Sequence, residues 1–344
     1  MNTSVAYRLA AHFFQKPRAL MLASLALATW CAAGVAASQS VALEKVTLAS
    51  WGKPISEVTN VLVEEDKGFF RNRGIDLSFM PGAGGGDAIR NLLSGQADVA
   101  FTDPGSFYLA IDKGAKLRAI YDIYPQNIFN VVSLKSSGIT KAADLKGKKI
   151  GVYSLNSGTR TNLQILLNQA GLTEADVTLV VTGLLNFAPL MQGQVDATAA
   201  TDTGLMVGRQ KGLADVNVLE VKNFLNYSSD IFVVREDTYR SKKDLLKRFL
   251  AAYQASAMWM LANPQEAAKL AIKRALDGQN EAINLEVIKL RNLSTVSPLT
   301  VRQGLGAMDV DTMQKAADAY LKIGLIEKPL KIRDYVAQDL LPGK

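Results

Sequence analysis

The chain has 344 residues, 48% of them hydrophobic and 21% charged, a composition typical of a folded globular protein and not of a disordered, collagen-like or coiled-coil chain. The net charge of +7 is uneven, because the first 37 residues hold three basic residues and no acid, which leaves 36 basic against 32 acidic residues in the remainder. A mild and dispersed excess of this kind argues against nucleic-acid binding, which usually needs clustered basic side chains.

Residues 1–37 are typical of a secretory signal peptide. Their basic residues precede an apolar run over 19–37, and a small-x-small cleavage pattern stands before Ser38. The alternative is a retained membrane anchor, because the run is nearly long enough to span a bilayer. We favour cleavage and therefore expect a soluble protein in the periplasm.

Cleavage would remove the only histidine, His12, and the only cysteine, Cys31. The mature chain would then lack a cysteine nucleophile, a Ser-His-Asp triad, disulfides and any zinc site built from His or Cys. We therefore expect no metal, no cofactor and no covalent catalysis.

Short β-branched runs alternate with amphipathic stretches along the mature sequence, a pattern that predicts an α/β fold with parallel strands. In the first part we expect strands at 46–49, 74–79 and 97–101, helices at 57–67 and 87–93, the latter capped by Asp87, and a further helix that begins at Pro104. In the middle we expect strands at 149–153, 177–181 and 196–200, with a helix that ends at Gly171. The C-terminal part is predicted to be helical at 242–261, 264–275, 280–291 and 308–321.

An internal repeat links residues 92–98 with residues 190–196. Both segments carry Gly-Gln-x-Asp after an expected helix, and both lead into a strand that finishes near Thr-Asp. A common helix-to-strand turn would explain this much. Because the flanking elements match as well, we interpret the repeat as two lobes built on one plan.

Two strand-to-helix junctions are candidate ligand contacts. The turn Gly84, Gly85 and Gly86 lacks the lysine of a phosphate-binding loop, because Asp87 stands in its place. Glycines at a helix N-terminus still let a ligand approach backbone N–H groups, although a purely steric need for glycine is an equal alternative. Ser154, Ser157 and Thr159 lie at the matching junction of the second half, where ordinary helix capping is the alternative.

Three further positions follow strands at the edge where open α/β sheets bind ligands. Asp103 and Asp202 could be taken for a catalytic pair, but without a nucleophile or metal ligands that interpretation is poor, and helix capping fits Asp103 better. Trp51 is a candidate stacking platform, with core packing as the alternative. The segment 227–230, which starts with Tyr227, precedes a strand near the same edge.

Several motifs in this order resemble a known family. They are Glu-Asp-Lys-Gly-Phe-Phe at 65–70, Gly-Ile-Asp-Leu at 74–77, the Gly-Gln-x-Asp repeat, the run 144–152 and Asn-Pro-Gln-Glu-Ala-Ala at 263–268. Over residues 45–335 the chain resembles solute-binding proteins of ABC importers, in the branch that handles nitrate, sulfonates, taurine and thiamine-pyrimidine precursors. The combination is specific for the family and not for a substrate.

The resemblance implies a type II periplasmic-binding-protein fold: two α/β lobes, each a mostly parallel sheet flanked by helices, joined by two crossing strands and closing by hinge motion. The crossings would be 129–133 and 231–234, the N-terminal lobe 41–130 plus 235–344, and the second lobe 131–234. Ligand contacts of the family fall on the loops after the first three strands of each lobe. At matching positions these are Trp51, Gly84, Gly85, Gly86, Thr102, Asp103, Ser154, Ser157, Thr159, Thr201 and Tyr227.

The function that follows is capture of a small organic solute and its delivery to an ABC permease and its ATPase in the inner membrane, by a monomer. Two facing helix N-termini favour a sulfonate- or carboxylate-like ligand, whereas Asp87 and Asp103 argue for an amine. A pyrimidine or thiamine precursor is the competing ligand, and an enzyme or a sensor module on the same scaffold is the competing class. The cysteine-rich motif of the pyrimidine-synthesising relatives is absent, which argues against their self-consuming activity.

Overall fold

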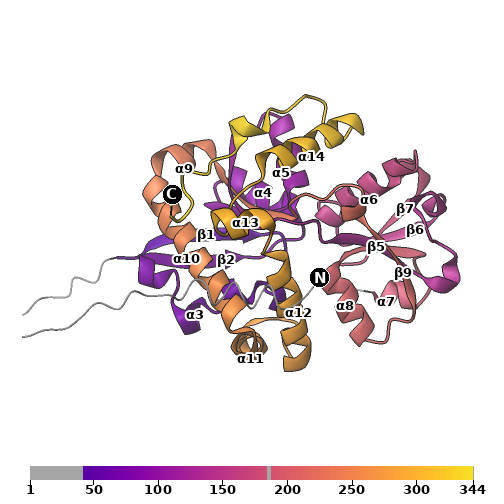
Figure 1. Ribbon diagram of the computed structural model, residues 1–344, viewed down its shortest axis with the longest axis horizontal. Helices are drawn as coiled ribbons and strands as arrows, with labels where there is room; N and C mark the ends of the chain where they lie inside the picture. Colours follow the sequence, from indigo (N-terminus) through magenta and orange to yellow (C-terminus); the bar gives the residue numbers. More distant parts are fainter. Residues whose placement is uncertain (1–41, 184–186, 344) are drawn as a thin grey trace, which may run out of the picture.

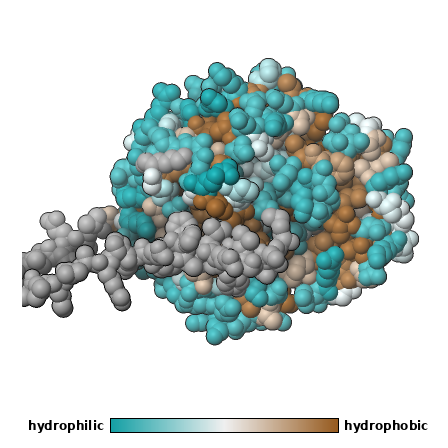
Figure 2. Space-filling model, viewed as in Figure 1, coloured by the Kyte–Doolittle hydropathy of each residue, from teal (hydrophilic) through white to brown (hydrophobic). Residues whose placement is uncertain are grey.

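The computed structural model describes residues 42–183 and 187–343, which form two α/β lobes lying next to each other (Figure 1). The predicted signal peptide, 1–37, lies outside the described residues. Within the described ranges no helix is both long enough and apolar enough to cross a bilayer. Hydrophilic side chains cover most of the face seen in Figure 2.

The first lobe is built on a sheet with strand order β2-β1-β3-β10-β4. Only β10 runs antiparallel to its neighbours, so four of the five strands point the same way. Their bounds are β1 Glu44–Ser50, β2 Ile75–Met80, β3 Val99–Thr102, β4 Leu117–Tyr124 and β10 Asp230–Arg235.

The second sheet repeats this plan with the order β7-β6-β8-β5-β9, and here β5 is the antiparallel strand. The bounds are β5 Phe129–Leu134, β6 Lys149–Val152, β7 Thr178–Val181, β8 Ala197–Thr201 and β9 Val216–Glu220. Two mostly parallel sheets of one design confirm the predicted fold class.

Helices flank both sheets, and the C-terminal ones, orange to yellow in Figure 1, cover the first. The second lobe holds α6 Gly158–Gln169, α7 Ala188–Met191 and α8 Asp202–Gln210. The first lobe holds α2 Thr59–Leu62, α3 Glu64–Lys67, α4 Gly85–Leu93, α5 Pro104–Asp112, α9 Glu236–Ser241, α10 Lys243–Ala262, α11 Pro264–Arg274, α12 Glu281–Ser294, α13 Pro298–Gln303 and α14 Val310–Lys322. Short 3₁₀ turns lie between them, among them η1 Ser56–Val58.

The chain passes between the sheets twice, through residues 125–128 and 221–229, next to the two strands that were predicted to carry the crossings. Here the structure differs from the predicted division, which put residues 131–234 together. β10 hydrogen-bonds to β3 and β4, so it belongs to the first sheet. Below, "first lobe" means residues 42–124 and 230–343, and "second lobe" means residues 129–220.

Three local predictions need correction. The expected helix at 57–67 is broken into η1, α2 and α3, because Val63 leaves helical geometry with φ −82° and ψ 12°. Asp87 does not cap its helix: Gly84 is the N-cap, and Asp87 lies in the first turn and accepts a hydrogen bond from the Ala83 amide. The strands β4 and β9 and the helices α8 and α13 were not predicted.

The internal repeat forms the same turn in both lobes. The Asp98 carboxylate accepts a hydrogen bond from the Thr47 amide over 3.0 Å, and the Asp196 carboxylate accepts one from the Lys149 amide over 2.7 Å. Each aspartate amide also donates back to the carbonyl of the same partner, over 2.9 and 2.8 Å. The repeated Asp therefore joins the start of one strand to the backbone of the neighbouring strand in each lobe.

Candidate functional site

A pocket of about 630 Å³, part of it open to solvent, lies between the lobes. The parallel strands of each sheet end at this gap, and the loops that follow them form its walls, as expected for open α/β sheets. From the first lobe the lining residues are Trp51, Glu57, Gly84, Gly85, Asp103 and Asp230, and Ile128 of the first crossing joins them. From the second lobe they are Phe129, Tyr153, Ser157, Gly158, Thr159, Gly183, Phe187, Thr198, Ala199, Ala200, Thr201 and Gly204.

Seven of the eleven residues predicted to bind the ligand line this pocket. They are Trp51, Gly84, Gly85, Asp103, Ser157, Thr159 and Thr201.

Two of the other four are buried elsewhere. The Thr102 side chain is fully buried, and its hydroxyl donates to the Gly85 carbonyl over 3.0 Å, so it supports the glycine turn from behind. Tyr227 lies in the core, where its hydroxyl and that of Tyr320 form a 2.9 Å hydrogen bond. Its ring packs among the aromatic side chains behind the cleft and does not reach the lining.

The remaining two residues join the lobes at the rim. The Gly86 amide donates to the Asn156 carbonyl over 3.1 Å. The Ser154 hydroxyl donates to the Ala83 carbonyl in the opposite direction, from second lobe to first. These contacts place the two strand-to-helix junctions against each other, with the pocket behind them.

Close packing explains the glycines of the first junction. Gly84 has φ +132°, and a Cβ at this position would lie 2.3 Å from the Asn156 carbonyl oxygen of the other lobe. A Cβ on Gly85 would lie 2.0 Å from a carboxylate oxygen of Asp103. The steric explanation therefore accounts for both residues, while their backbone also lines the pocket.

Asp103 caps α5, as its position before Pro104 suggested. Its carboxylate accepts hydrogen bonds from the Ser106 amide over 2.9 Å and from the Ser106 hydroxyl over 2.7 Å. Ser157 is the N-cap of α6, but its hydroxyl donates to the Ser154 carbonyl over 2.7 Å instead of accepting from the helix. That leaves the first amides of α6 open toward the pocket.

Three carboxyl groups line the pocket: Glu57, Asp103 and Asp230. Burial raises the pKa of all three, most strongly for Asp230, where the neighbouring Asp103 and Glu57 charges raise it further. Asp230 is only 5% exposed, and its carboxylate accepts no hydrogen bond from any residue in the described ranges. A ligand that brings a positive charge or N–H donors would satisfy Asp230, whereas Asp103 and Glu57 already accept hydrogen bonds within the protein.

Hydrogen-bond donors without partners also belong to residues that line the pocket. The amides of Gly158 and Thr159, at the N-terminus of α6, have no hydrogen-bond acceptor among the described residues. The same is true of the buried Trp51 Nε1 and of the Thr198 hydroxyl. These donors suit an acceptor atom or a partial negative charge on the ligand.

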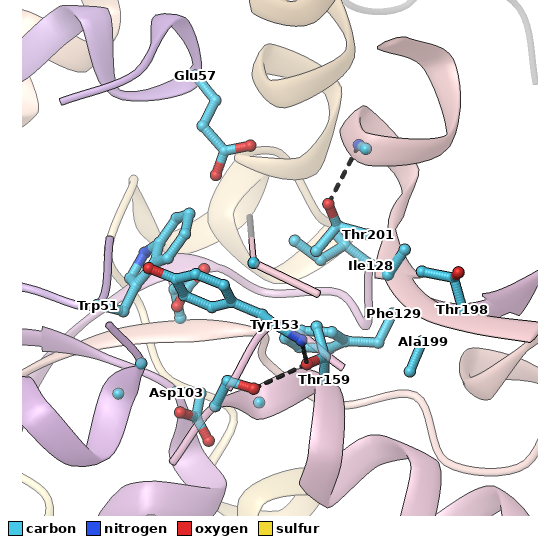
Figure 3. A pocket seen from close by; sticks show the side chains of 18 of the residues that line it. Trp51, Glu57, Asp103, Ile128, Phe129, Tyr153, Thr159, Thr198, Ala199 and Thr201 are labelled. Atoms are coloured by element: carbon cyan, nitrogen blue, oxygen red, sulfur yellow. Dashed lines mark hydrogen bonds between the residues drawn. The ribbon is translucent and has the colours of Figure 1, made fainter. Parts of the chain in front are cut away.

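Figure 3 shows the aromatic part of the site. The rings of Trp51 and Tyr153 come from opposite lobes, and the Glu57 and Asp103 carboxylates lie on opposite sides of them in this view. The Trp51 ring is held edge-on against Phe101, with centroids 6.2 Å apart and an interplanar angle of 84°. Trp51 is therefore anchored to the sheet while part of its surface still faces the pocket.

No lysine or arginine is among the lining residues. Arg160, which directly follows Thr159, pairs with both carboxylate oxygens of Glu174, over 2.8 and 2.9 Å. Within the described ranges, no group of three or more His, Cys, Asp or Glu side chains is placed to hold a metal ion.

Sequence reasoning missed Glu57 and Tyr153 as lining residues, and it named Asp230 only within a segment. Glu57 follows the first strand just as Asp103 follows the third, so its place at the carboxyl edge was the available signal. No sequence pattern indicates that the Tyr153 side chain reaches the opposite lobe, where its hydroxyl contacts the Gly82 carbonyl.

The two-lobe fold with its intervening pocket is that of periplasmic solute-binding proteins. The alkanesulfonate-binding protein SsuA from Xanthomonas axonopodis pv. citri has the same fold, with a TM-score of 0.69 at 17% identity over 86% of this chain and 98% of that chain. Residues 55–267 match the NMT1/THI5-like family, and the chain belongs to this family.

Two relatives extend the comparison over most of the chain. A Haemophilus influenzae protein named for thiamine biosynthesis is 25% identical over 283 residues, which are 81% of this chain and 87% of the relative. The riboflavin-binding protein RibY of Chloroflexus aurantiacus is 24% identical over 307 residues, 88% of this chain and 87% of the relative. The names of these relatives point to no common ligand, so the ligand of this chain has to be argued from its own pocket.

Proposed function

We propose that this protein is an exported solute-binding protein that captures a small organic solute between its lobes and delivers it to an ABC importer. The observation that carries the proposal is the pocket between the lobes. Its walls come from both lobes, and some polar atoms of its lining residues have no hydrogen-bond partner among the described residues. Export follows from the signal-peptide pattern of residues 1–37, and delivery to a permease follows from the family resemblance.

The polarity of the pocket supports a particular kind of ligand. Acceptors gather on the first-lobe side in Glu57, Asp103 and Asp230, and free amides of Gly158 and Thr159 lie on the second-lobe side. A solute with an amine or N–H group at one end and an acceptor at the other satisfies both sets. An aminopyrimidine fits this description, and so does an aminosulfonate.

A plain sulfonate or carboxylate is disfavoured by the same groups. Its charge would face three carboxyl groups, and no lysine or arginine is among the described lining residues; Arg291, which contacts Glu57, is shared with Asp202. The expectation of a sulfonate- or carboxylate-like ligand rested on the helix N-termini, and the three carboxyl groups of the lining favour a ligand that also carries an amine.

Titration calorimetry with matched pairs of probes tests this. 2-Aminoethanesulfonate is compared with ethanesulfonate, and 4-aminopyrimidine with pyrimidine, so that each pair differs only in the amine. We expect the aminated member of at least one pair to bind at one site per chain, roughly tenfold or more tighter than its mate, and to be recovered unchanged. Equal binding within both pairs would overturn the ligand class, and chemical conversion of a probe would overturn the binding role.

The variant Asp230→Asn tests whether the Asp230 carboxylate binds the amine of the probe. It removes the charge of the unpartnered pocket carboxylate and should weaken the aminated probe roughly tenfold. Asp122→Asn is the matched control, because Asp122 is a buried aspartate of the same lobe that does not line the pocket. Equal effects of the two substitutions would contradict the assignment.

A further inference from the structure

Arg291 is the largest fully buried side chain among the described residues, and it lies between the lobes. It belongs to α12, which the first lobe holds through two hydrogen bonds: Asn284 donates to the Ala268 carbonyl, and Asn292 donates to the Met260 carbonyl. In Figure 1, α12 lies between the first lobe and α8 of the second. A buried arginine at such a boundary is costly unless its charge is matched on both sides.

The partners of this guanidinium come from both lobes. Its Nη2 atom lies 2.9 Å from a carboxylate oxygen of Asp202 and 2.9 Å from the Thr203 hydroxyl, at the start of α8. The same atom lies 3.3 Å from a carboxylate oxygen of Glu57 in the first lobe. Thr203 in turn donates to Glu57 over 2.8 Å, so the four side chains form one network.

Two features set this network apart. Of the ion pairs between residues in the described ranges, only that of Arg291 with Asp202 joins the first lobe to the second. The network also includes Glu57, which lines the pocket. The pocket wall and the lobe contact therefore share a side chain.

We propose that Arg291 and Asp202 form a latch that stabilises the closed arrangement of the lobes and couples it to the pocket through Glu57. The latch contributes one charged contact across the boundary, while the hydrogen bonds of Gly86 and Ser154 join the lobes at the rim. Opening the lobes separates Asp202 and Thr203 from Arg291, and leaves Glu57 with Arg291 as its only partner in the network. The coupling to a bound solute rests on the proposed function; the latch itself does not.

Electron–electron distance measurements test the latch without any ligand. Spin labels are attached at Asp76→Cys and Thr178→Cys, two exposed positions on the edge strands β2 and β7 of the two sheets. In the ligand-free, unsubstituted background, part of the population should show the short distance that corresponds to the structure described here, and the rest should show longer distances. Asp202→Asn, which keeps an acceptor for the Thr203 amide but removes the charge, should shift population toward longer distances.

Glu174→Gln is the matched control. Glu174 pairs with Arg160 inside the second lobe, and the side chains of Glu174 and Asp202 are 31% and 30% exposed. This variant should keep the background distance distribution. Arg291→Met removes the other partner of the latch and should likewise shift the population toward longer distances. Circular dichroism that matches the unsubstituted background shows that the variant is folded.

Kinetics supply the second readout. For a probe that binds, Asp202→Asn should raise the dissociation rate roughly tenfold, whereas Glu174→Gln should leave it unchanged. The proposal is overturned if the ligand-free background shows no short distance, or if Asp202→Asn and its control give the same distances. The distance measurement needs no ligand. If no probe binds, the proposed function is contradicted, but the test of the latch is unaffected.

Discussion

The hydroxyl of Tyr153 donates a hydrogen bond to the backbone carbonyl of Gly82 over 3.2 Å, and this contact runs from the second lobe to the glycine turn of the first. Tyr153 also lines the pocket. One side chain thus lines the pocket and also contributes to the contact between the lobes.

Tyr153→Phe should therefore weaken binding without unfolding the protein. One neutral hydrogen bond across the lobes is worth about 0.5–1.5 kcal/mol, which predicts a loss of affinity of roughly twofold to tenfold. Titration calorimetry measures this loss. Tyr239→Phe, which removes a hydroxyl that contacts Asp339 within the first lobe, should bind as the unsubstituted protein does. Equal affinity for Tyr153→Phe would show that the contact does not form in the bound state.

The glycine turn offers a steric test of closure. Gly84→Ala places a Cβ 2.3 Å from the Asn156 carbonyl of the opposite lobe, and should lower affinity by roughly tenfold or more, because the lobes cannot approach. Gly86→Ala, two residues on in the same helix, meets Asn156 at 3.2 Å and should have a much smaller effect. Since Gly84 has φ +132°, some loss of stability is expected as well, and thermal unfolding of the ligand-free variants measures it separately. Matching affinities for the two variants would contradict closure at this turn.

The pocket carboxyls predict how binding depends on pH. Burial raises the pKa of Glu57, Asp103 and Asp230, so the ligand-free site keeps protons to a higher pH than free carboxyl groups do, and an aminated ligand displaces them. Affinity for a probe whose amine stays protonated should then increase as the pH rises above the usual carboxyl range. Calorimetry in two buffers with different ionisation enthalpies measures the proton release. Proton uptake, or affinity that falls over this range, would indicate an anionic ligand instead.

Asp122 makes a separate prediction about stability. Burial raises its pKa in the folded protein from 3.8 to about 8, although the Ser228 hydroxyl donates to it over 2.6 Å. Between these pH values the folded chain keeps a proton that the unfolded chain has lost, so the free energy of unfolding should fall as the pH rises from about 4 to about 8 and then level off.

Asp122→Asn removes this contribution and keeps an acceptor for Ser228. Urea unfolding at about pH 5 and about pH 9 should show a smaller decrease in stability for the variant than for the unsubstituted protein. The exposed substitution Asp311→Asn serves as the control and should not change the difference. Parallel behaviour of Asp122→Asn and the unsubstituted protein would show that Asp122 is not a buried acid.

Much of the fold was predictable because its signals are local. The Gly-Gln-x-Asp repeat marks the same turn in each lobe, and Asp103 before Pro104 marks a helix cap. The loops that follow parallel strands had to meet at one edge, which is why seven of the eleven predicted residues line the pocket.

The remainder depended on contacts between distant segments. Nothing near Arg291 in the sequence indicates that it meets Asp202, 89 residues away, and a charged residue in a predicted helix is normally taken to be exposed. The assignment of β10 to the first sheet likewise depends on pairing with β3 and β4. Tyr227 lies just before β10, near the predicted edge of the sheet, but its ring packs in the core beside Tyr320.

Small-angle X-ray scattering with and without a saturating aminated probe tests the central claim, that the two lobes close over a solute. The account predicts a smaller radius of gyration with the probe, and a scattering curve for the bound form that matches the structure described here. An unchanged curve at saturation would contradict capture between the lobes.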